Sequence, residues 1–357
     1  MLKTDYLILG GGYAGVPLAY RLARKGEDFL LVNRRPYQTL AALLPELITG
    51  SICEEEGIIW LKPLLKKVLV AEVREIDLSG RRVVALDHGR ESVLVGWRKA
   101  LVICLGWEPD VRFPAKGVCF VRELPDAFMA RRALYLQEGQ RVVICGGGFV
   151  GVEYAGEIAT DLGIKLGLEI HLVEAAPDLL SGLPPEARKK ARSVLEERGV
   201  KIHTGVPVEA IDKGRLVLKD GTEIPGDLFL WAAGVRASRV LEASGFEVDE
   251  RGRALVDEYL RAQGREDVFV LGDCAGTGLP MLGQIAVQQG KFLGEYLPQI
   301  VSGQEPPPPR FAYKGLVVSL GEAEAVAALG DRVSFSGMLA VVLKKILGKK
   351  YFLDIRI

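Results

Sequence analysis

Residues 5–15 read DYLILGGGYAG, and residues 141–151 read RVVICGGGFVG. In each stretch a short apolar run ends in glycines with the spacing G-x-G-x-x-G, and a helix-like segment follows. This order is typical of a dinucleotide-binding βαβ unit, because the glycines permit a tight turn, a close approach of a pyrophosphate and close packing of helix on strand. One copy is a weak signal, since glycine turns after strands are common. Two copies in the same context predict two nucleotide sites.

The segments around these turns predict the fold. We expect parallel strands over residues 5–10 and 29–32 in the first unit, and over residues 141–145 and 170–173 in the second, each pair joined by a helix. These strands are continuous apolar runs, which is the pattern of strands buried on both faces of a parallel sheet. The predicted fold class is therefore α/β, with two Rossmann-like dinucleotide-binding domains and a small C-terminal appendage.

Two further stretches, residues 68–87 and 201–224, alternate apolar and polar positions around a glycine-containing turn. We expect an antiparallel hairpin at each. A run of prolines at residues 306–309 is typical of a stiff spacer. The predicted domain boundaries are 1–107 and 236–305 for the two parts of the first nucleotide domain, 108–235 for the second nucleotide domain, and 306–357 for a C-terminal segment that contacts a membrane or a second subunit.

The composition excludes several classes of protein. Lys plus Arg and Asp plus Glu both number 46, so the formal net charge is zero and no nucleic-acid partner is indicated. No apolar run reaches the roughly 20 residues that span a bilayer, and no signal peptide is recognisable. We therefore expect the cytoplasm, or the cytoplasmic side of the cell membrane, as the location. The few histidines and the odd number of unpaired cysteines predict no metal site and no dithiol redox centre.

The residue that closes the second strand of each unit bears on nucleotide choice. Glu174 can accept hydrogen bonds from both ribose hydroxyls of an adenosine, and its charge repels a 2′-phosphate, so the second unit should prefer NADH to NADPH. The corresponding residue of the first unit is Asn33, a neutral amide that can still bond a ribose. Arg34 and Arg35, which follow it, suit a pyrophosphate, although a solvated surface pair is the alternative.

A second contact for the first nucleotide is expected further along the chain. Gly272 and Asp273 follow the apolar strand at residues 268–271, where an acid can reach a nucleotide bound at the strand ends. An aspartate between a strand and a helix can instead serve only as the helix N-cap. Taken alone, the cap is the simpler interpretation of Asp273.

With these motifs in place, the chain resembles the flavoproteins of the FAD-dependent pyridine nucleotide-disulfide oxidoreductase superfamily, and within them the type II NADH:quinone oxidoreductases. The two glycine motifs are shared across the superfamily. More specific to the quinone reductases are residues 283–290, GQIAVQQG, and residues 311–315, FAYKG. The resemblance implies that FAD occupies the first unit, that NADH occupies the second, and that two electrons pass to a membrane quinone without proton pumping.

The resemblance also implies contact residues at matching positions. The FAD contacts would be Gly10, Gly12, Tyr13, Ala14, Gly15, Asn33, Arg34, Val73 through its backbone, Asp273, Ala286, Val287 and Lys314. The NADH contacts would be Gly146, Gly148, Gly151, Glu174 and Gly234. The sequence departs from the family pattern around Lys314, where it is two residues shorter, and at residues 104–106, where Cys-Leu-Gly replaces Ala-Thr-Gly.

Three residues are candidates for the reaction itself. Glu157 matches a family glutamate close to the nicotinamide and the flavin, with an exposed helix acid as the alternative. Gln284 and Gln288 lie four residues apart and therefore share one helix face. Neutral amides can hydrogen-bond a quinone carbonyl without introducing a charge, although a merely polar helix face would look the same.

Residues 337–353 predict an amphipathic helix at the end of the chain. Leu339, Val342 and Ile346 belong to one apolar stripe, and lysines that include Lys344 and Lys345 flank it. The stretch is too short to span a bilayer and suits a position at the membrane surface. Packing on the protein body and a homodimer contact are the alternatives.

Two other functions stay open on the sequence alone. A sulfide:quinone or ferredoxin-type reductase has the same scaffold, but sulfide chemistry needs paired reactive cysteines, and no such pair is visible in the sequence. A flavoprotein that binds NADH and signals through a partner, without catalysis, would also carry both glycine motifs.

Overall fold

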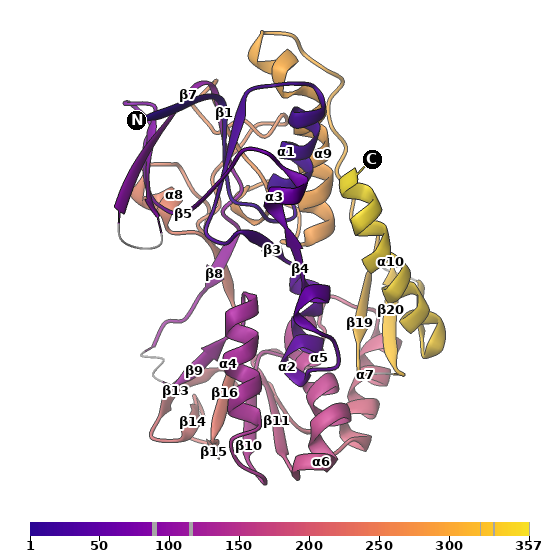
Figure 1. The fold of residues 1–357 in the computed structure, drawn as a ribbon. Helices are drawn as coiled ribbons and strands as arrows, with labels where there is room; N and C mark the ends of the chain where they lie inside the picture. The colour runs from indigo at the N-terminus through magenta and orange to yellow at the C-terminus, as the bar shows by residue number, and fades with distance from the viewer. Residues whose placement is uncertain (88–90, 114–116, 322, 331–332, 357) are drawn as a thin grey trace.

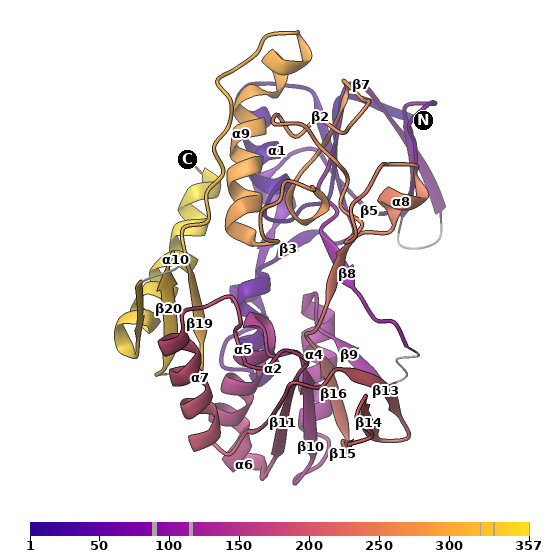
Figure 2. The same cartoon turned by 180° about the vertical axis from the view of Figure 1, so that it is seen from behind.

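The computed structural model describes residues 1–87, 91–113, 117–321, 323–330 and 333–356. Figure 1 shows two α/β units stacked along the long axis of the molecule, with the C-terminal segment lying along one side of both. Figure 2 shows the same arrangement from behind, with the helices α1 and α9 side by side on the first unit. The predicted α/β fold class with a C-terminal appendage is confirmed.

The first sheet forms around the glycine turn that opens the sequence. Its central strand β1 (Leu2–Leu9) pairs in parallel with β2 (Phe29–Asn33) on one side and with β7 (Glu91–Ile103) on the other. The apolar run of β1, from Tyr6 to Leu9, is almost completely buried, as the sequence predicts. The sheet is completed by β5 (Val68–Asp77), β6 (Arg82–Asp87) and β18 (Val268–Val270).

The hairpin predicted for residues 68–87 is confirmed. Strands β5 and β6 are antiparallel, and β6 pairs in the same way with the first part of β7. The second part of β7 returns to the parallel sheet beside β1, so the antiparallel strands are an extension of the same sheet. Short elements of the first unit are β3 (Tyr37–Thr39), β4 (Ile58–Trp60), α3 (Leu61–Leu64) and α8 (Val240–Ala243).

Glycines allow α1 (Gly15–Arg24) and α9 (Gly283–Val301) to pack closely. A Cβ placed on Gly290 would lie 2.2 Å from the carbonyl oxygen of Ala14, and one on Gly294 would lie 2.9 Å from Cβ of Arg21. Because no side chain is present at these two positions, the backbones approach each other directly. This contact fixes the start of α9 next to the first glycine turn.

The second unit repeats this architecture. Its parallel sheet has the order β12-β11-β10-β16-β9, with β10 at the centre. The strands are β9 (Val118–Phe120), β10 (Arg141–Cys145), β11 (Glu169–Glu174), β12 (Lys201–Thr204) and β16 (Leu228–Trp231). The helices are α4 (Leu124–Leu134), α5 (Phe149–Ile158), a π-helical turn (Ala159–Gly163), α6 (Ile164–Leu166) and α7 (Pro185–Glu197).

The prediction for residues 201–224 needs a correction. Strand β12 belongs to the parallel sheet and is not the first strand of a hairpin. The antiparallel strands are β13 (Val208–Asp212), β14 (Arg215–Leu218) and β15 (Glu223–Pro225). The turn at Gly221 was predicted, but a second turn at Lys213, which has a left-handed φ of 47°, was not.

A strand pair and a helix that crosses over both join the two units. Strands β8 (Trp107–Pro109) and β17 (Val235–Ala237) pair antiparallel where the chain crosses from one unit to the other. Helix α2 (Leu44–Thr49) comes from the first unit in sequence, yet it packs against α4 and α5 of the second. Its residues Leu44, Leu47 and Ile48 are part of the hydrophobic core of the second unit. The units therefore share side-chain packing as well as chain connections.

The C-terminal segment is a small α/β unit. Strands β19 (Leu316–Ser319), β20 (Ala325–Leu329) and β21 (Val333–Ser336) form an antiparallel sheet, and α10 (Met338–Arg356) lies against it. The sheet packs on α5 and α7 of the second unit, and α10 also contacts α1 of the first. Among the helices described, none has an apolar stretch long enough to cross a membrane.

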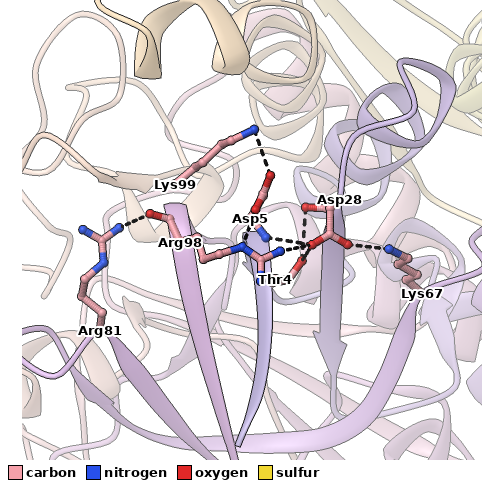
Figure 3. Close-up of polar contacts among 7 residues, drawn as sticks. All are labelled: Thr4, Asp5, Asp28, Lys67, Arg81, Arg98 and Lys99. Carbon is pink, nitrogen blue, oxygen red and sulfur yellow. Dashed lines mark hydrogen bonds and ion pairs between the residues drawn. The ribbon is translucent and has the colours of Figure 1, made fainter.

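Charged side chains of β1 and β7 form a network with Asp28 and Lys67, which directly precede β2 and β5 (Figure 3). The Asp28 carboxylate accepts hydrogen bonds from Lys67 at 2.5 Å and from Arg98 at 2.7 Å. Arg98 also contacts Asp5 at 2.6 Å, and Lys99 contacts Asp5 at 2.9 Å. The hydrogen bond from Lys67 lowers the pKa of Asp28, and those from Lys99 and Arg98 lower the pKa of Asp5.

We predict that Asp28→Asn lowers the free energy of unfolding by about 1 kcal/mol at neutral pH and low salt, because it removes the negative charge that Lys67 and Arg98 share and one of the two oxygens that accept from them. The pKa of Asp28 is lower in the folded protein than in the unfolded chain, so its contribution is present above the unfolded pKa and is lost as the pH falls through the folded value. The free energies of unfolding of the parent protein and Asp28→Asn, measured with urea, should therefore become equal in acid and in high salt. Glu209→Gln, at an exposed position of β13, is the matched control. A difference that did not change with pH would contradict this account.

Candidate functional site

A continuous cleft with a volume of about 2620 Å³ runs between the two units and under the C-terminal segment. The first glycine turn, the start of α5, the start of α9 and one face of α10 all contribute to its walls. The predicted site residues that line it are Gly10, Gly12, Tyr13, Ala14, Asn33, Arg34, Val73, Glu157, Gly234, Asp273, Gln284, Ala286, Val287, Gln288 and Lys314. One cleft thus brings together residues from most of the length of the chain.

The first glycine turn has three positions with different spatial limits. A Cβ on Gly10, whose φ is +102°, would lie 2.2 Å from the Cys104 carbonyl oxygen. One on Gly15 would lie 1.9 Å from the Gly10 carbonyl oxygen. Around Gly12, apart from its own neighbours in the chain, no atom of the described residues lies within 4 Å of such a Cβ. Gly10 and Gly15 are therefore required by the packing of strand on helix, whereas Gly12 leaves room at the wall of the cleft.

The second turn repeats these limits. A Cβ on Gly146, with φ +114°, would lie 2.7 Å from the Ala232 carbonyl carbon, and one on Gly151 would lie 1.8 Å from the Gly146 carbonyl oxygen. At Gly148 the space is again open within 4 Å among the described residues. The repeated geometry shows that both turns are built in the same way, with one open glycine each.

Asn33 and Glu174, the last residues of β2 and β11, each accept a hydrogen bond from the backbone of the neighbouring glycine turn. The backbone N–H of Gly11 donates to Asn33 Oδ1 at 2.8 Å, and the N–H of Gly147 donates to Glu174 Oε2 at 2.5 Å. The Asn33 amide nitrogen donates to the carbonyls of Arg35 and Tyr37, so both of its protons are used. Glu174 Oε1 accepts from the N–H of Ala176 at 2.7 Å. Each side chain still has an oxygen lone pair to offer a ligand hydroxyl.

Arg34 and Arg35 are paired with Glu123 of the second unit. Glu123 Oε2 contacts Arg35 Nε at 3.1 Å, and its other oxygen forms an ion pair with Arg34. Glu123 also caps the N-terminus of α4. Glu123 could not be predicted from the sequence, because nothing in the local pattern connects residue 123 with residues 34 and 35. The pair links the two units along one side of the cleft.

Asp273 lies at the base of the cleft, in the short turn that follows β18. Burial raises its pKa to about 6, and the charge of Arg253 opposes this shift. No described residue hydrogen-bonds its carboxylate, whereas the neighbouring N–H of Gly272 donates to Gln289 at 2.6 Å. Asp273 is half-buried, and a carboxylate that is partly withdrawn from water without a protein partner is stabilised when a ligand supplies a donor. The start of α9, with Ala286 and Val287, lies beside it.

Gln284 and Gln288 hold the segment that precedes β19. Gln284 donates from Nε2 to the Gly315 carbonyl at 2.7 Å and accepts from the Lys314 N–H at 3.0 Å. Gln288 both donates to and accepts from the backbone of Ala312 at 3.0 Å, and it donates as well to the Gln284 carbonyl. The two amide protons of Gln288 are therefore used within the chain, while one amide proton of Gln284 has no partner among the described residues.

Glu157 is almost completely buried on α5 and faces the cleft. Its Oε1 accepts a hydrogen bond from the Ser319 hydroxyl at 2.6 Å. Burial raises the pKa of Glu157 to about 7, while the Ser319 hydroxyl opposes the shift and Glu46 adds to it. The alternative of an exposed helix acid is wrong for this residue. A carboxyl with a pKa near neutrality can hold or release a proton under ordinary conditions.

The comparison with known proteins agrees with this geometry. Residues 4–290 match the family described as pyridine nucleotide-disulphide oxidoreductase. The chain is 30% identical to the type II NADH:quinone oxidoreductase of Staphylococcus saprophyticus, with 97% of this chain and 94% of that protein covered. Identity and coverage are the same for the protein of that name from Staphylococcus aureus strain MSSA476. The chain belongs to the type II NADH:quinone oxidoreductase family.

Solved structures show the same fold at lower identity. NDH2 from Plasmodium falciparum in complex with NADH matches with a TM-score of 0.86 at 17% identity, over 99% of this chain and 97% of that chain. The sulfide:quinone oxidoreductase from Aquifex aeolicus matches with a TM-score of 0.82 at 17% identity, over 100% and 92% of the two chains. Family membership therefore comes from the sequence relatives, and these structures support the fold.

In this member of the type II NADH:quinone oxidoreductase family, a largely but not completely buried ion cluster joins three helices near Glu157. Lys344 of α10 contacts Glu46 of α2 at 3.0 Å and Glu153 of α5 at 3.2 Å. Burial opposes the charge on Lys344, but Glu153 and Glu46 outweigh it and raise the pKa of this lysine. The expectation that Lys344 flanks the outer apolar stripe of the helix is wrong, because its side chain points inward to these carboxylates. The spacing of Glu153 and Glu157 on one helix face was the only sequence signal for the cluster.

Tyr351, near the end of α10, was also missed. Its ring lies 4.8 Å from the ring of Tyr13, measured between centroids, and its hydroxyl accepts a 2.5 Å hydrogen bond from Gln38. All three residues line the cleft. Helix α10 thus closes the cleft against the first unit as well as the second.

We predict that Lys344→Met destabilises the protein by about 3 kcal/mol, because the buried Glu46 and Glu153 lose their shared cation. Urea unfolding should show the loss, and limited proteolysis should show faster cleavage within residues 306–357. Lys345→Met, an exposed neighbour on the same helix, is the control and should have little effect. Equal behaviour of the two variants would contradict the role of Lys344 in docking α10.

Proposed function

We propose that the protein passes two electrons from NADH to a quinone by way of bound FAD. The observation that carries this proposal is that the two units contain glycine turns of the same construction, in a chain that belongs to the type II NADH:quinone oxidoreductase family. The first turn lines the cleft between the units, and so do Phe149 and Val150, which follow the open glycine of the second turn. When bound, FAD supplies the redox chemistry, as an acceptor of hydride from NADH and a donor of electrons to quinone. The protein residues bind, orient and exclude water.

The first unit fits FAD. We assign this role to residues 1–107 and 236–305. The open space at Gly12 admits a pyrophosphate next to the backbone, where the N-terminus of α1 would offer its N–H groups. The Asp273 carboxylate, which has no partner among the described residues, is suited to accept a hydrogen bond from a hydroxyl of the flavin side chain. Val73, Ala286, Val287 and Lys314 line the remaining wall.

The second unit, residues 108–235, fits NADH. The open space at Gly148 has the same place in its turn as Gly12 has in the first. Both oxygens of Glu174 are fixed by backbone N–H groups, so their remaining lone pairs are oriented for the two ribose hydroxyls. The negative charge of Glu174 would repel the 2′-phosphate of NADPH, and no lysine or arginine follows directly in the sequence to bind that phosphate. Gly234, with φ +63°, lies where the chain leaves the unit beside the cleft.

Quinone would bind where the C-terminal segment covers the cleft. Gln284 has one amide proton left for a quinone carbonyl, while Gln288 fixes the backbone that carries Lys314. Glu157 can hold a proton at its free carboxylate oxygen next to this place. Side chains of Leu316, Val317, Val341 and Leu347 add an apolar wall suited to a lipid-soluble substrate.

The experiment that tests the proposal is an anaerobic titration of the FAD-loaded protein with NADH and with NADPH, followed by addition of quinone. We expect rapid bleaching of the flavin absorbance by NADH, at least tenfold slower bleaching by NADPH, and recovery of the absorbance on addition of quinone. In Gln288→Leu, bleaching by NADH should stay fast and recovery should slow about tenfold or more, because residues 312–315 lose their anchor. Gln299→Leu, at an exposed position of the same helix, is the control.

Other outcomes of this titration would exclude the proposal. Slow bleaching by NADH in Gln288→Leu would contradict the assignment of this residue to the quinone side. A long-lived NADH complex without recovery by any quinone would favour the sensing flavoprotein instead. The sulfide:quinone alternative is disfavoured by the thiols, because burial raises the pKa of Cys104 and that of Cys274 and keeps both protonated.

We further propose that α10 rests on the cytoplasmic face of the membrane. The side chains of Leu339, Val342 and Ile346 are between 47% and 73% exposed on its outer face, and Lys345 and Lys350 lie beside them. An apolar stripe with flanking lysines suits the headgroup region of an anionic bilayer. Such a position would place the apolar wall of the cleft close to the membrane that holds the quinone.

We predict that the protein co-sediments with vesicles that contain anionic lipid, and that Leu339→Asp combined with Ile346→Asp reduces bound protein at least tenfold. The introduced charges would have to enter the apolar layer. A pair of the same changes at Leu136 and Ile164, which are exposed elsewhere, should leave binding unchanged. If the first variant dissociated a dimer in ultracentrifugation without changing vesicle binding, the stripe would be a contact between two copies of the chain.

A further inference from the structure

The end of β19 and the middle of α5 are in unusually close contact. A Cβ on Gly156 of α5 would lie 2.5 Å from the Leu320 carbonyl carbon. A Cβ on Gly321, whose φ is +113°, would lie 2.1 Å from the Thr160 hydroxyl oxygen. Two glycines, one on each side, therefore let the backbone at residues 319–321 lie directly on the helix.

This contact places Ser319 between two buried glutamates. The backbone N–H of Ser319 donates to Glu153 Oε1 at 3.0 Å, and its hydroxyl donates to Glu157 Oε1 at 2.6 Å. Only 6% of Ser319 is exposed, so water does not compete for these bonds. The backbone bond does not depend on the side chain of residue 319, whereas the bond to Glu157 depends on the hydroxyl alone.

We propose that Ser319 is a positioning residue for Glu157: its hydroxyl fixes the carboxylate through Oε1, leaves Oε2 to the cleft, and favours the ionised form of the carboxyl. A hydrogen bond donated to a carboxylate stabilises the charged state over the neutral one. The proposal deepens the proposed function, on which the importance of Glu157 rests. Ser319 itself has no redox or acid–base role.

The surroundings of Glu157 explain why one hydroxyl matters. Burial disfavours its charge, and Glu46 of α2 and Asp161 of the π-helical turn act in the same direction. Lys344 of α10 acts in the opposite direction, but it is already bonded to Glu46 and Glu153. Ser319 is thus the direct hydrogen-bond donor to Glu157 among the described residues. Reduction of a quinone to a quinol takes up two protons, so the pH at which this carboxyl gains its proton bears directly on the reaction.

The test is an infrared titration of buried carboxyl groups in the FAD-loaded protein, without NADH or quinone. The band that disappears in Glu157→Gln identifies Glu157 in the spectrum. In Ser319→Ala the midpoint of this band should move to higher pH by about one unit or more, because a hydrogen bond to a charged group is lost. Ser336→Ala, which removes a hydroxyl from β21 of the same sheet, should leave the midpoint unchanged. An unchanged midpoint in Ser319→Ala would overturn the proposal.

A second variant and a second measurement separate this proposal from the function on which it rests. Ser319→Cys keeps the size of the side chain but donates more weakly, so it should move the midpoint in the same direction by less; a shift in the opposite direction would overturn the proposal. The pH profile of quinone reduction should move with the midpoint in each variant. A midpoint that moves while the pH profile does not would support the role of Ser319 towards Glu157 and refute the role of Glu157 in turnover.

Discussion

The absence of a Cβ at Gly15 and Gly151 is the constraint on which the rest of the structure depends. In each unit this glycine lies against the carbonyl oxygen of the first glycine of the turn. A Cβ at this position would come within 1.9 Å of that oxygen, so only glycine fits. Only with this contact can the helix begin directly at the strand end and direct its N–H groups at the ligand. Because the same packing occurs in both units, each unit has one open glycine, Gly12 in the first and Gly148 in the second.

The parts of the fold that follow from local pattern could be predicted from the sequence. The parallel strands and the hairpin at residues 68–87 have clear periodicity, and the structure confirms them. Strand β12 was mistaken for part of a hairpin, because a short alternating run looks the same in a parallel edge strand and in an antiparallel one. The sheet of the C-terminal segment was not predicted at all, since its strands are short and pair only with one another.

The candidate site divides in the same way. Residues within a motif, such as Gly12 and Asn33, could be placed because the motif fixes their geometry. Glu123 and Lys344 could not, because each finds its partners in segments that are distant in sequence. Lys344 illustrates the reason: helical periodicity reports which residues share a face, but a lysine on the inner face is identified only by the carboxylates that surround it.

Helix α10 has an exposed apolar face on the outside. Its inner face contacts the rest of the protein through Lys344 and Tyr351. This arrangement limits how the protein can be engineered. Truncating the chain before α10 to make the surface less apolar would also remove a wall of the cleft and leave Glu46 and Glu153 without their lysine partner. A water-soluble version would instead have to keep the whole helix and exchange only its outward residues for polar ones.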